Sequence, residues 1–381
     1  MMKKLNKSIL RKIFFQKAVF SKLIFICVVL LSSGFSQPVD YKYRIPRQFN
    51  DGWEVSSLQA EGIDIGPIEE ISAQIRDRDT IDHILSLLII KNGKLVHEVY
   101  SPYCQRNTLH VLASITKTVT STLIGIAIDQ GFIEGVDSKV YTLIPEFEDQ
   151  IKDPGFSEVS LKHIMTMTSG LDWNERISYN DPQNDEFQMV EAENWMAYVL
   201  SKPMVVKPGT EFNYNTGSIH LLSAVLKSVS GLYAHQFAEK YLLHPMGIYG
   251  YQWNKDPMGY PCTGGTDGGI GLRTRDVAKF GWLFLRDGKW KDKRILSEKW
   301  VKEAPRSYTK MSGRRRYAYN WFSGSMTVNQ KQFDYIASFG YGGQTLYIVP
   351  EHDLILVITC ELAESGPNSA LVRKVFEAAI H

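Results

Sequence analysis

The pattern of apolar and polar residues predicts strands at both ends of the chain. The segment LSLLIIKNGKLVHEVYS (85–101) holds two apolar runs on either side of Asn92-Gly93, a dipeptide that favours the tight turn of a β-hairpin. The segment TLYIVPEHDLILVITC (345–360) holds two β-branched runs around the turn Pro350–Asp353. Both segments are therefore expected to be pairs of strands.

The middle of the chain instead has the apolar spacing of three to four residues that is typical of helices. Gly131 and Gly170 mark the ends of two such segments, since glycine commonly follows the last helical residue. A glycine-rich turn, TGGTDGGIG (263–271), precedes the last long helix before the C-terminal strands. The expected helices are Ser114–Gln130, 161–170, Asn194–Leu200, Ile219–Ser230, Arg273–Arg286 and Ala370–Ile380.

Strands at both ends with helices between them predict an α/β lobe that is built from both termini, with a helical lobe inserted. The sheet lobe is expected over about residues 37–110 and 265–381, and the helical lobe over about residues 111–264. The segment before the first hairpin is expected to be a loop. The chain has no internal repeat and no low-complexity tract.

The first 36 residues have the composition of an export signal. Seven basic residues and no acidic residue precede the apolar run Leu23–Leu31, which the small residues Gly34 and Ser36 follow. Cleavage is expected before Gln37, so that residues 37–381 would be periplasmic or secreted and would meet the membrane only during export. The alternative is an uncleaved anchor, although the apolar run is shorter than the roughly 20 residues of a membrane-spanning helix.

Removal of this segment makes the remaining chain acidic. It leaves 36 basic against 41 acidic residues, a net charge of −5, which argues against nucleic acid as a partner because such binding needs a basic surface. The one dense basic run, Arg314–Arg316, is interpreted as a solvated loop. The cysteines that remain, Cys104, Cys262 and Cys360, permit one disulfide, but their odd number and wide spacing predict neither a disulfide scaffold nor a zinc site.

The stretch ASITKTVTSTLIGIAIDQG (113–131) places Ser114 three residues before Lys117 on an apolar helix. Their Cβ atoms would be roughly 5–6 Å apart. Ser307 and Lys310 repeat this spacing in a polar, basic stretch, whereas the apolar neighbours of Lys117 are expected to lower its pKa and let the neutral amine act as a base. In the alternative, structural interpretation, Ser114 caps the helix and Lys117 extends to solvent.

Two later segments have residues that suit acyl transfer. The segment KPGTEFNYNTGSIHLL (207–222) places Tyr214 in a loop just before a helix, where a phenol can point into a cleft. The segment SFGYGGQTLYIVP (338–350) has three glycines that lead into a strand, where N–H groups can point at a developing oxyanion. Together with the serine and lysine, these segments favour nucleophilic serine chemistry.

At these motifs the chain resembles the β-lactamase-related serine hydrolases, which include class C β-lactamases, D-alanyl-D-alanine carboxypeptidases, certain esterases and 6-aminohexanoate-dimer hydrolases. The resemblance implies an α+β fold, in which a mostly antiparallel sheet flanked by helices adjoins a helical lobe and the site lies between them. It covers roughly residues 85–362 and rests on the segments HVLASITKTVTSTLIGIAIDQG, LKHIMTMTSGLDW, PGTEFNYNTGSIHLLSAVL, GGIGLRTRDVAKFGWLFLRDGKW and GYGGQTLYIVPEHDLILVIT.

The resemblance also implies roles for individual residues. Ser114 would be the nucleophile, Lys117 its activating partner and Tyr214 the second proton carrier. The backbone N–H groups of Ser114 and Gln344 would form the oxyanion hole, and no metal or organic cofactor would be needed. The further substrate-binding positions implied are Gly343, Tyr341 and Thr216.

The chain departs from the family pattern at two positions. Thr216 stands where many members have an asparagine two residues after the tyrosine, which leaves a shorter hydroxyl to bind a substrate carbonyl. Tyr341-Gly342-Gly343 replaces the Lys/His-Thr/Ser-Gly strand of penicillin-recognising members. Loss of that cation would weaken the binding of carboxylate substrates by roughly 1.5–3 kcal/mol, or about one to two powers of ten. Arg273 and Arg275 are candidates for a replacement cation.

The sequence thus predicts an exported serine hydrolase that cleaves a small amide, ester or peptide through an acyl-enzyme. The alternatives are a penicillin-recognising β-lactamase or D-alanyl-D-alanine carboxypeptidase and, in a different class, a catalytically silent ligand-binding homologue. The lack of a G-x-S-x-G motif argues against an α/β-hydrolase. His97-Glu98 has no histidine four residues after His97 and is not a zinc-protease motif.

Overall fold

The computed structural model describes residues 41–77, 81, 83–306, 308–310, 316–362 and 369–381. The expected export signal, its cleavage site before Gln37, Ser307 and the first two residues of Arg314–Arg316 lie outside these residues. Within the described part of the chain, no helix is both long enough and apolar enough to cross a membrane.

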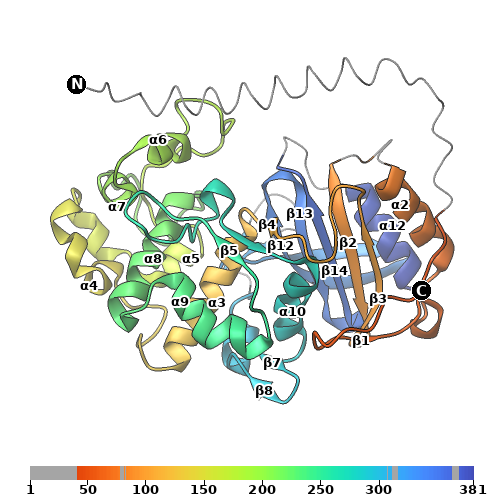
Figure 1. Ribbon diagram of the computed structural model, residues 1–381. Coiled ribbons are helices and arrows are strands. Elements are labelled where there is room, and N and C mark those ends of the chain that lie inside the picture. The colour runs from red at the N-terminus through yellow and green to blue at the C-terminus, as the bar shows by residue number, and fades with distance from the viewer. Residues whose placement is uncertain (1–40, 78–80, 82, 307, 311–315, 363–368) are drawn as a thin grey trace, which may run out of the picture. The chain divides into compact units, whose positions relative to one another are not determined.

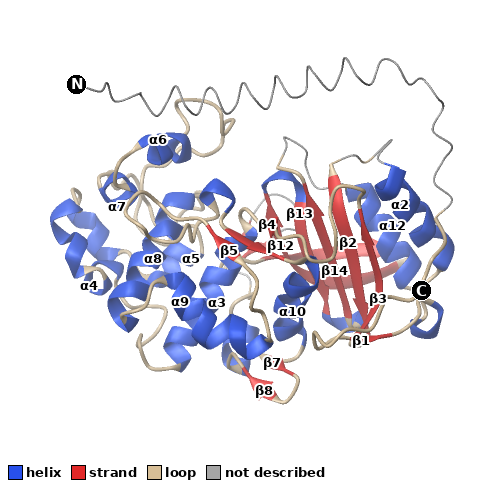
Figure 2. Cartoon of the chain, in the orientation of Figure 1, coloured by secondary structure: helices blue, strands red, loops and turns tan. Residues whose placement is uncertain are grey.

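A nine-stranded sheet dominates one side of the molecule (Figure 2). Its strand order is β1-β3-β2-β14-β13-β12-β11-β10-β9, and every neighbouring pair is antiparallel except β1 and β3. The strands are β1 Glu54–Val55, β2 Ile84–Lys91, β3 Lys94–Tyr100, β9 Thr309–Lys310, β10 Arg316–Tyr317, β11 Phe322–Val328, β12 Lys331–Gly340, β13 Gln344–Val349 and β14 Leu354–Cys360.

Both predicted strand pairs are confirmed. The turn between β2 and β3 has positive φ at Asn92 (49°) and Gly93 (81°), as a two-residue hairpin turn of type I′ requires. A short 3₁₀ turn over Pro350–His352 joins β13 to β14. Because β2 pairs with β14, strands from near the two ends of the described chain meet in the middle of the sheet.

Helices cover both faces of this sheet (Figure 1). On one face, α2 (Ile65–Asp77) and α12 (Ser369–Ala379) pack against each other, and their apolar residues share a core with the sheet. On the other face, α10 (Thr274–Leu285) packs on β2, β13 and β14. As a result, β13 and β14 are buried at every position.

The helices from α3 to α9 form most of the other side of the molecule (Figure 1). There, α3 (Ile115–Asp129) packs against α8 (Thr216–Ser230) and also contacts β12 and β13, so it links the helices to the sheet. The remaining elements are α4 Val140–Leu143, α5 Leu161–Met165, α6 Asp185–Glu191, α7 Trp195–Leu200, α9 Ala234–Ala238, α11 Glu298–Glu303, the small sheet of β4 His110–Val111, β6 Ile270–Leu272 and β5 Gln252–Trp253, and the β7 Lys289–Trp290 and β8 Lys293–Arg294 hairpin.

Three parts of the prediction need correction. The segment before the first hairpin is not all loop, because α2 buries Ile68, Ile71 and Ile75 despite a proline in its first turn, a position that tolerates proline. The helix predicted over 161–170 is only five residues long, since Met167 leaves the helical conformation with a φ of +58°. The strands β11 and β12 were not predicted.

Candidate active site

Ser114 stands immediately before α3, in a turn that the neighbouring backbone holds. Ala113 has a φ of +46°, a left-handed conformation that is uncommon for residues other than glycine. The N–H of Leu112 donates to Ile270 O at 2.9 Å, and the N–H of Ala113 donates to Gly268 O at 2.9 Å. The strained turn before the serine is therefore fixed from β6 and the glycine-rich segment that leads into it.

Two glycines let other segments approach this turn closely. A Cβ at Gly265, where φ is +89°, would come within 2.4 Å of Ala113 O and 2.9 Å of Ser114 N. A Cβ at Gly340, the last residue of β12, would come within 2.3 Å of Leu112 O. The start of α3, the glycine-rich turn and the end of β12 thus meet at Ser114 with no space for side chains between their backbones.

Lys117 points back at Ser114 from within the protein. Its Nζ donates to Ser114 Oγ at 2.8 Å and to Gly264 O at 2.5 Å, and the Tyr214 phenol is a third hydrogen-bond partner. The Lys117 side chain is buried, and the Ser114 hydroxyl does not cap α3. The structural interpretation, with a capping serine and a lysine that extends to solvent, is therefore wrong.

The predicted lowering of the Lys117 pKa is also wrong. Desolvation does lower this pKa and is the largest single effect, but Tyr214, Glu175 and Glu186 together outweigh it and raise the pKa above its ordinary value. The hydrogen bonds agree with a cation, since an ammonium has three N–H donors and Lys117 has three partners. The sequence around Lys117 did not reveal this because both glutamates come from distant segments.

Tyr214 is half-buried between two asparagines that fix the backbone on either side of it. The side chain of Asn215 caps the N-terminus of α8. Asn213 donates from its backbone N–H to Met167 O at 2.8 Å and from its amide to Trp173 O at 2.8 Å. The prediction that Tyr214 lies in a loop just before a helix is confirmed, and its ring centroid lies 4.9 Å from Lys117 Nζ.

Thr216 lies next to the site, but its side chain points into the protein interior. It is 1% exposed, and its hydroxyl donates to Glu175 Oε1 at 2.6 Å. The hydroxyl was expected to bind a substrate carbonyl in place of an amide, but this geometry commits it to Glu175.

Gln344 begins β13, where its side chain links two strands. Its amide donates to Cys360 O at 2.7 Å, and its Oε1 accepts from Cys360 N at 3.0 Å. Gln344 pairs with Gly340, whose backbone lies against Leu112. Among the described residues, the N–H of Ser114 has no hydrogen-bond acceptor, as a donor reserved for an oxyanion requires.

Tyr341 and Gly343 form the turn that leads into β13. Gly343 is buried, whereas Tyr341 is 37% exposed. The Tyr341 ring meets the equally exposed ring of Tyr179 edge to face, with centroids 5.4 Å apart. Tyr341 therefore touches the loop between α5 and α6.

The two arginines considered as replacement cations have other surroundings. Arg275 donates to Glu98 at 2.8 and 2.5 Å and to Asp51 at 2.7 Å, so its charge is already neutralised. The guanidinium of Arg273 packs against Gly250. Arg275 therefore does not supply the positive charge that penicillin-recognising members have at the position of Tyr341.

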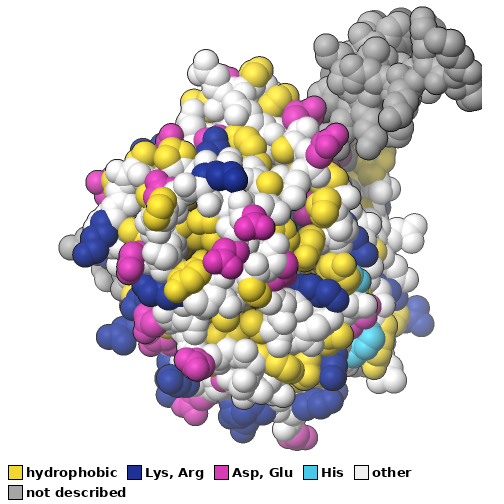
Figure 3. Space-filling model, turned by 90° about the vertical axis from the view of Figure 1, so that its left-hand side faces the viewer, with side chains coloured by type: hydrophobic (Ala, Val, Ile, Leu, Met, Phe, Trp, Pro, Cys, Tyr) yellow, Lys and Arg dark blue, Asp and Glu magenta, His cyan; other side chains and the backbone are white. Residues whose placement is uncertain are grey.

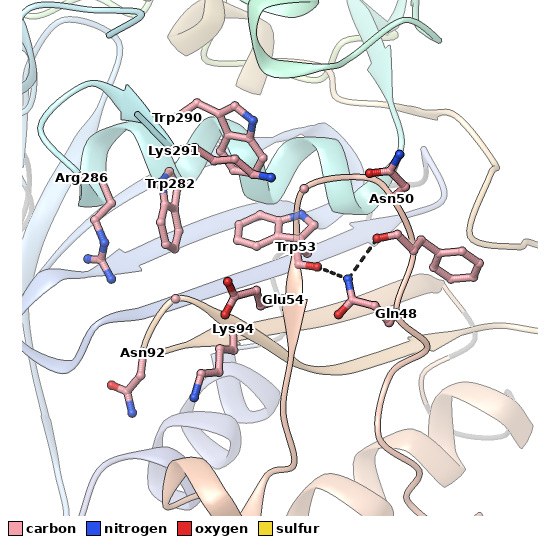
Figure 4. Close-up of a pocket in the computed structure, with 13 residues that line it drawn as sticks. Gln48, Asn50, Trp53, Glu54, Asn92, Lys94, Trp282, Arg286, Trp290 and Lys291 are labelled. Atoms are coloured by element: carbon pink, nitrogen blue, oxygen red, sulfur yellow. Dashed lines mark hydrogen bonds between the residues drawn. The ribbon is translucent and has the colours of Figure 1, made fainter. Parts of the chain in front are cut away.

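A cavity of about 460 Å³ lies away from these residues, between the segment before β1, the β2–β3 turn and the end of α10 (Figure 4). Two of its cations already have partners, since Arg286 donates to Asp353 at 2.5 and 2.7 Å and Lys94 donates to Glu61 at 2.8 Å. None of the predicted catalytic residues lines this cavity, so it is not where the serine chemistry would take place.

The chain matches the Beta-lactamase family over residues 80–379. It belongs to that family. This Beta-lactamase family protein is 22% identical over 303 residues to the 6-aminohexanoate-dimer hydrolase of Paenarthrobacter ureafaciens, an alignment that covers 71% of each chain. The predicted membership of a β-lactamase-related family of hydrolases is therefore confirmed.

Two solved structures are similar to this Beta-lactamase family protein. EstCE1, described as a hydrolase with promiscuous acyltransferase activity, has a TM-score of 0.67 at 16% identity, covering 85% of this chain and 100% of EstCE1. A class C beta-lactamase mutant has a TM-score of 0.59 at 17% identity, covering 81% of this chain and 96% of that chain. The predicted α+β fold of the serine β-lactamases is thereby confirmed.

Several further groups of this family member were missed or left open by the sequence. Glu175 and Glu186 both act on Lys117, but nothing in their local sequence distinguishes them from surface glutamates.

The three cysteines of the described chain are free thiols and buried. The sequence had left their disulfide pairing open. The described residues contain no cluster of His, Cys, Asp or Glu that would hold a metal ion. On the face shown in Figure 3, basic and acidic side chains are interspersed.

Proposed function

We propose that the protein is an exported serine hydrolase that cleaves a small amide or ester through an acyl-enzyme on Ser114. The observation that carries this proposal is the contact of Ser114 with Lys117, a buried lysine that also bonds Tyr214. A nucleophile within hydrogen-bond reach of a proton-transfer group is the arrangement that covalent catalysis needs. Export rests on the composition of residues 1–36.

With Lys117 as a cation, Tyr214 is the proposed acceptor of the first proton. An ammonium has no lone pair to accept a proton, so the base in this mechanism is the oxygen of its other partner, Tyr214, in the phenolate form. The Ser114 proton passes to this phenolate while Oγ forms a bond to the substrate carbonyl carbon. The carbonyl π electrons move onto oxygen, and the N–H groups of Ser114 and Gln344 bind the oxyanion.

The same phenol completes the cycle. Tyr214 gives its proton to the leaving nitrogen or oxygen as that atom's bond to carbon breaks, which leaves an ester on Ser114. A water molecule then gives a proton to the phenolate and attacks the ester. When Oγ leaves, it takes the proton back from Tyr214, and the free acid departs.

Because Tyr341 is neutral, the proposed substrates have acyl groups without a carboxylate next to the scissile bond. A phenol offers a neutral hydrogen bond where penicillin-recognising enzymes place a cation. Linear amides and simple esters are therefore the proposed substrates, and the names of the 6-aminohexanoate-dimer hydrolase and the hydrolase EstCE1 support this choice. A β-lactamase activity is the second candidate, since a class C beta-lactamase shares the fold.

The test is turnover of a substrate panel by residues 37–381. The panel comprises a p-nitrophenyl ester, a linear amide oligomer, a cephalosporin and a D-alanyl-D-alanine peptide. Ser114→Ala should abolish turnover of the ester or amide, whereas Ser307→Ala, which alters the second S-x-x-K, should retain it. The absence of Ser114-dependent turnover across the panel would instead favour a silent binding protein.

A further inference from the structure

Two glutamates outside the predicted catalytic set lie beside it. Glu175 belongs to the loop between α5 and α6, and Glu186 lies in the first turn of α6. Both act electrostatically on Lys117. The acyl-transfer steps proposed above use neither of them, so their role needs a separate explanation.

Glu175 is held by four hydrogen bonds. Its Oε2 accepts from Trp173 Nε1 and from Thr216 N, both at 2.8 Å, and its Oε1 accepts from Thr216 Oγ1 at 2.6 Å and from Tyr179 OH at 3.2 Å. The Thr216 N–H lies at the N-terminal end of α8, where the helix dipole favours a negative charge. These donors hold the Glu175 carboxyl group in one orientation beside Thr216.

Glu186 is hydrogen-bonded to Glu175 and accepts from Thr266 Oγ1 at 2.7 Å. A hydrogen bond between two carboxyl groups requires a proton on one of them. Desolvation first, and then the charge of Glu175, raise the pKa of Glu186 to about 8. At neutral pH the proton therefore resides on Glu186, and the pair carries at most one negative charge.

The groups around the pair are mostly neutral, so they do not cancel its charge near Lys117. Burial raises the pKa values of the neighbouring groups Tyr179, Tyr317 and Cys262, which keeps them neutral. Tyr214 faces Lys117. The titratable and charged groups that face the pair or its neighbours are Lys117 on α3, Tyr179, Tyr214, Tyr317 on β10, and Cys262 with Asp256 and Asp267.

The proposed reaction creates a need for such a charge. When the Tyr214 phenolate takes the Ser114 proton, Lys117 loses its negative neighbour while it remains buried. A buried ammonium without a counterion is strongly disfavoured. The hydrogen bonds of Glu175 persist throughout, because they come from residues that transfer no proton in the reaction.

We propose that the Glu175–Glu186 pair is the permanent counterion of Lys117, so that both glutamates are positioning residues of the acyl transfer. This inference rests on the proposed function. Because the pair shares one proton, either glutamate alone can supply the single negative charge after its partner becomes glutamine.

A double-mutant cycle tests the proposal. The purified variants Glu175→Gln, Glu186→Gln and the double variant would be compared with Glu191→Gln, an exposed position on the same helix. For the ester that the unaltered protein hydrolyses, kcat/KM would be measured from about pH 5 to about pH 10. Thermal unfolding of each variant would show which of them remain folded.

Each single variant should keep kcat/KM within about tenfold of the unaltered protein, and the double variant should lose at least about tenfold more than the product of the single losses. Its alkaline limb should also move down by about one pH unit, since Lys117 loses its counterion. Additive losses with an unchanged pH profile would overturn the proposal and leave the glutamates a structural role. If the double variant is unfolded, the pH profile of kcat/KM for Glu186→Gln tests the proposal instead. It should lack the inflection near pH 8 that the unaltered protein shows.

Infrared spectroscopy tests the shared proton without relying on enzymatic activity. A protonated-carboxyl band that disappears as the pH rises through about 8 should be present in the unaltered protein and absent from Glu186→Gln. Without that band the shared proton is refuted, whether or not the protein hydrolyses any substrate. If the band is present but no substrate is turned over, the proposed function fails while the carboxyl pair stands.

Discussion

Lys117 Nζ lies 2.5 Å from the carbonyl oxygen of Gly264, a contact that ties α3 to the glycine-rich turn. The carbonyl orients the ammonium, so that its other donors reach Ser114 and Tyr214. A group that serves two functional partners from a fixed position loses little conformational freedom during the reaction. The proposed mechanism therefore depends on a buried, oriented ammonium group on Lys117.

Replacement of Lys117 tests that dependence. Lys117→Met keeps most of the side-chain volume but removes the donors to the serine and the phenol, so kcat/KM should fall by at least about 10³-fold. Steady-state kinetics would measure the loss, and circular dichroism would show that the variant is folded. Lys310→Met, in the second S-x-x-K, is the sequence-matched control. Activity of Lys117→Met near that of the control would contradict the assignment.

The close packing of the glycine-rich turn against the serine predicts a difference between two glycine variants. Gly265 and Gly259 have φ values of +89° and +90°, but only at Gly265 would a Cβ meet another backbone, whereas Gly259 has nothing within 4 Å. Both alanine variants should lose about 1 kcal/mol from backbone strain. Gly265→Ala should lose further stability and most activity, because Ala113 and Ser114 must shift.

Urea unfolding and the rate of ester hydrolysis would be measured for both glycine variants. Equal stability and equal rates would show that the turn does not hold the serine in place. A loss of activity in Gly265→Ala alone would support the proposed role of the turn.

The carboxyl pair predicts how stability depends on pH. The pKa of Glu186 is raised from 4.5 to about 8, so the folded protein keeps a proton that the unfolded chain releases over this range. Because the folded state binds more protons, this group makes the free energy of unfolding fall as the pH rises from about 4.5 to about 8. Urea unfolding at several pH values should show a smaller decline for Glu186→Gln than for Glu191→Gln, and equal declines would refute the raised pKa.

Tyr341 is predicted to limit the binding of carboxylate substrates. Tyr341→Lys would place a cation at this position and should improve kcat/KM for a cephalosporin or a D-alanyl-D-alanine peptide by about one to two powers of ten. Tyr341→Phe, which removes the hydroxyl without adding a charge, should give no such gain. An equal response of both variants would show that the position does not set preference by charge.

The sequence predicts well those elements whose signals are local. The β2–β3 hairpin follows from Asn92-Gly93, and α3 follows from its apolar spacing up to Gly131. By contrast, β11 and β12 meet at Asn329-Gln330, which takes positive φ values of 47° and 63° without the glycine that usually marks such a turn. Tertiary pairing, rather than turn composition, determines this hairpin.

The catalytic residues could likewise be predicted only where the signal in the sequence is local. The spacing of Ser114 and Lys117 at the start of one helix brings them together, and the structure confirms that they are in contact. The charge state of Lys117 depends on Glu175 and Glu186, which only the folded chain brings near it. Long-range electrostatics therefore reversed a pKa direction that the apolar neighbours of Lys117 had favoured.

The central claim is that Ser114 becomes acylated. Its most direct test is the intact mass of residues 37–381 after brief exposure to a fluorophosphonate and to a slowly hydrolysed ester, followed by peptide mapping. An acyl-enzyme on Ser114 predicts one added group per chain on the peptide that contains Ser114, and no addition to Ser114→Ala. An unmodified mass with both reagents, or an equal addition to Ser114→Ala, would contradict it.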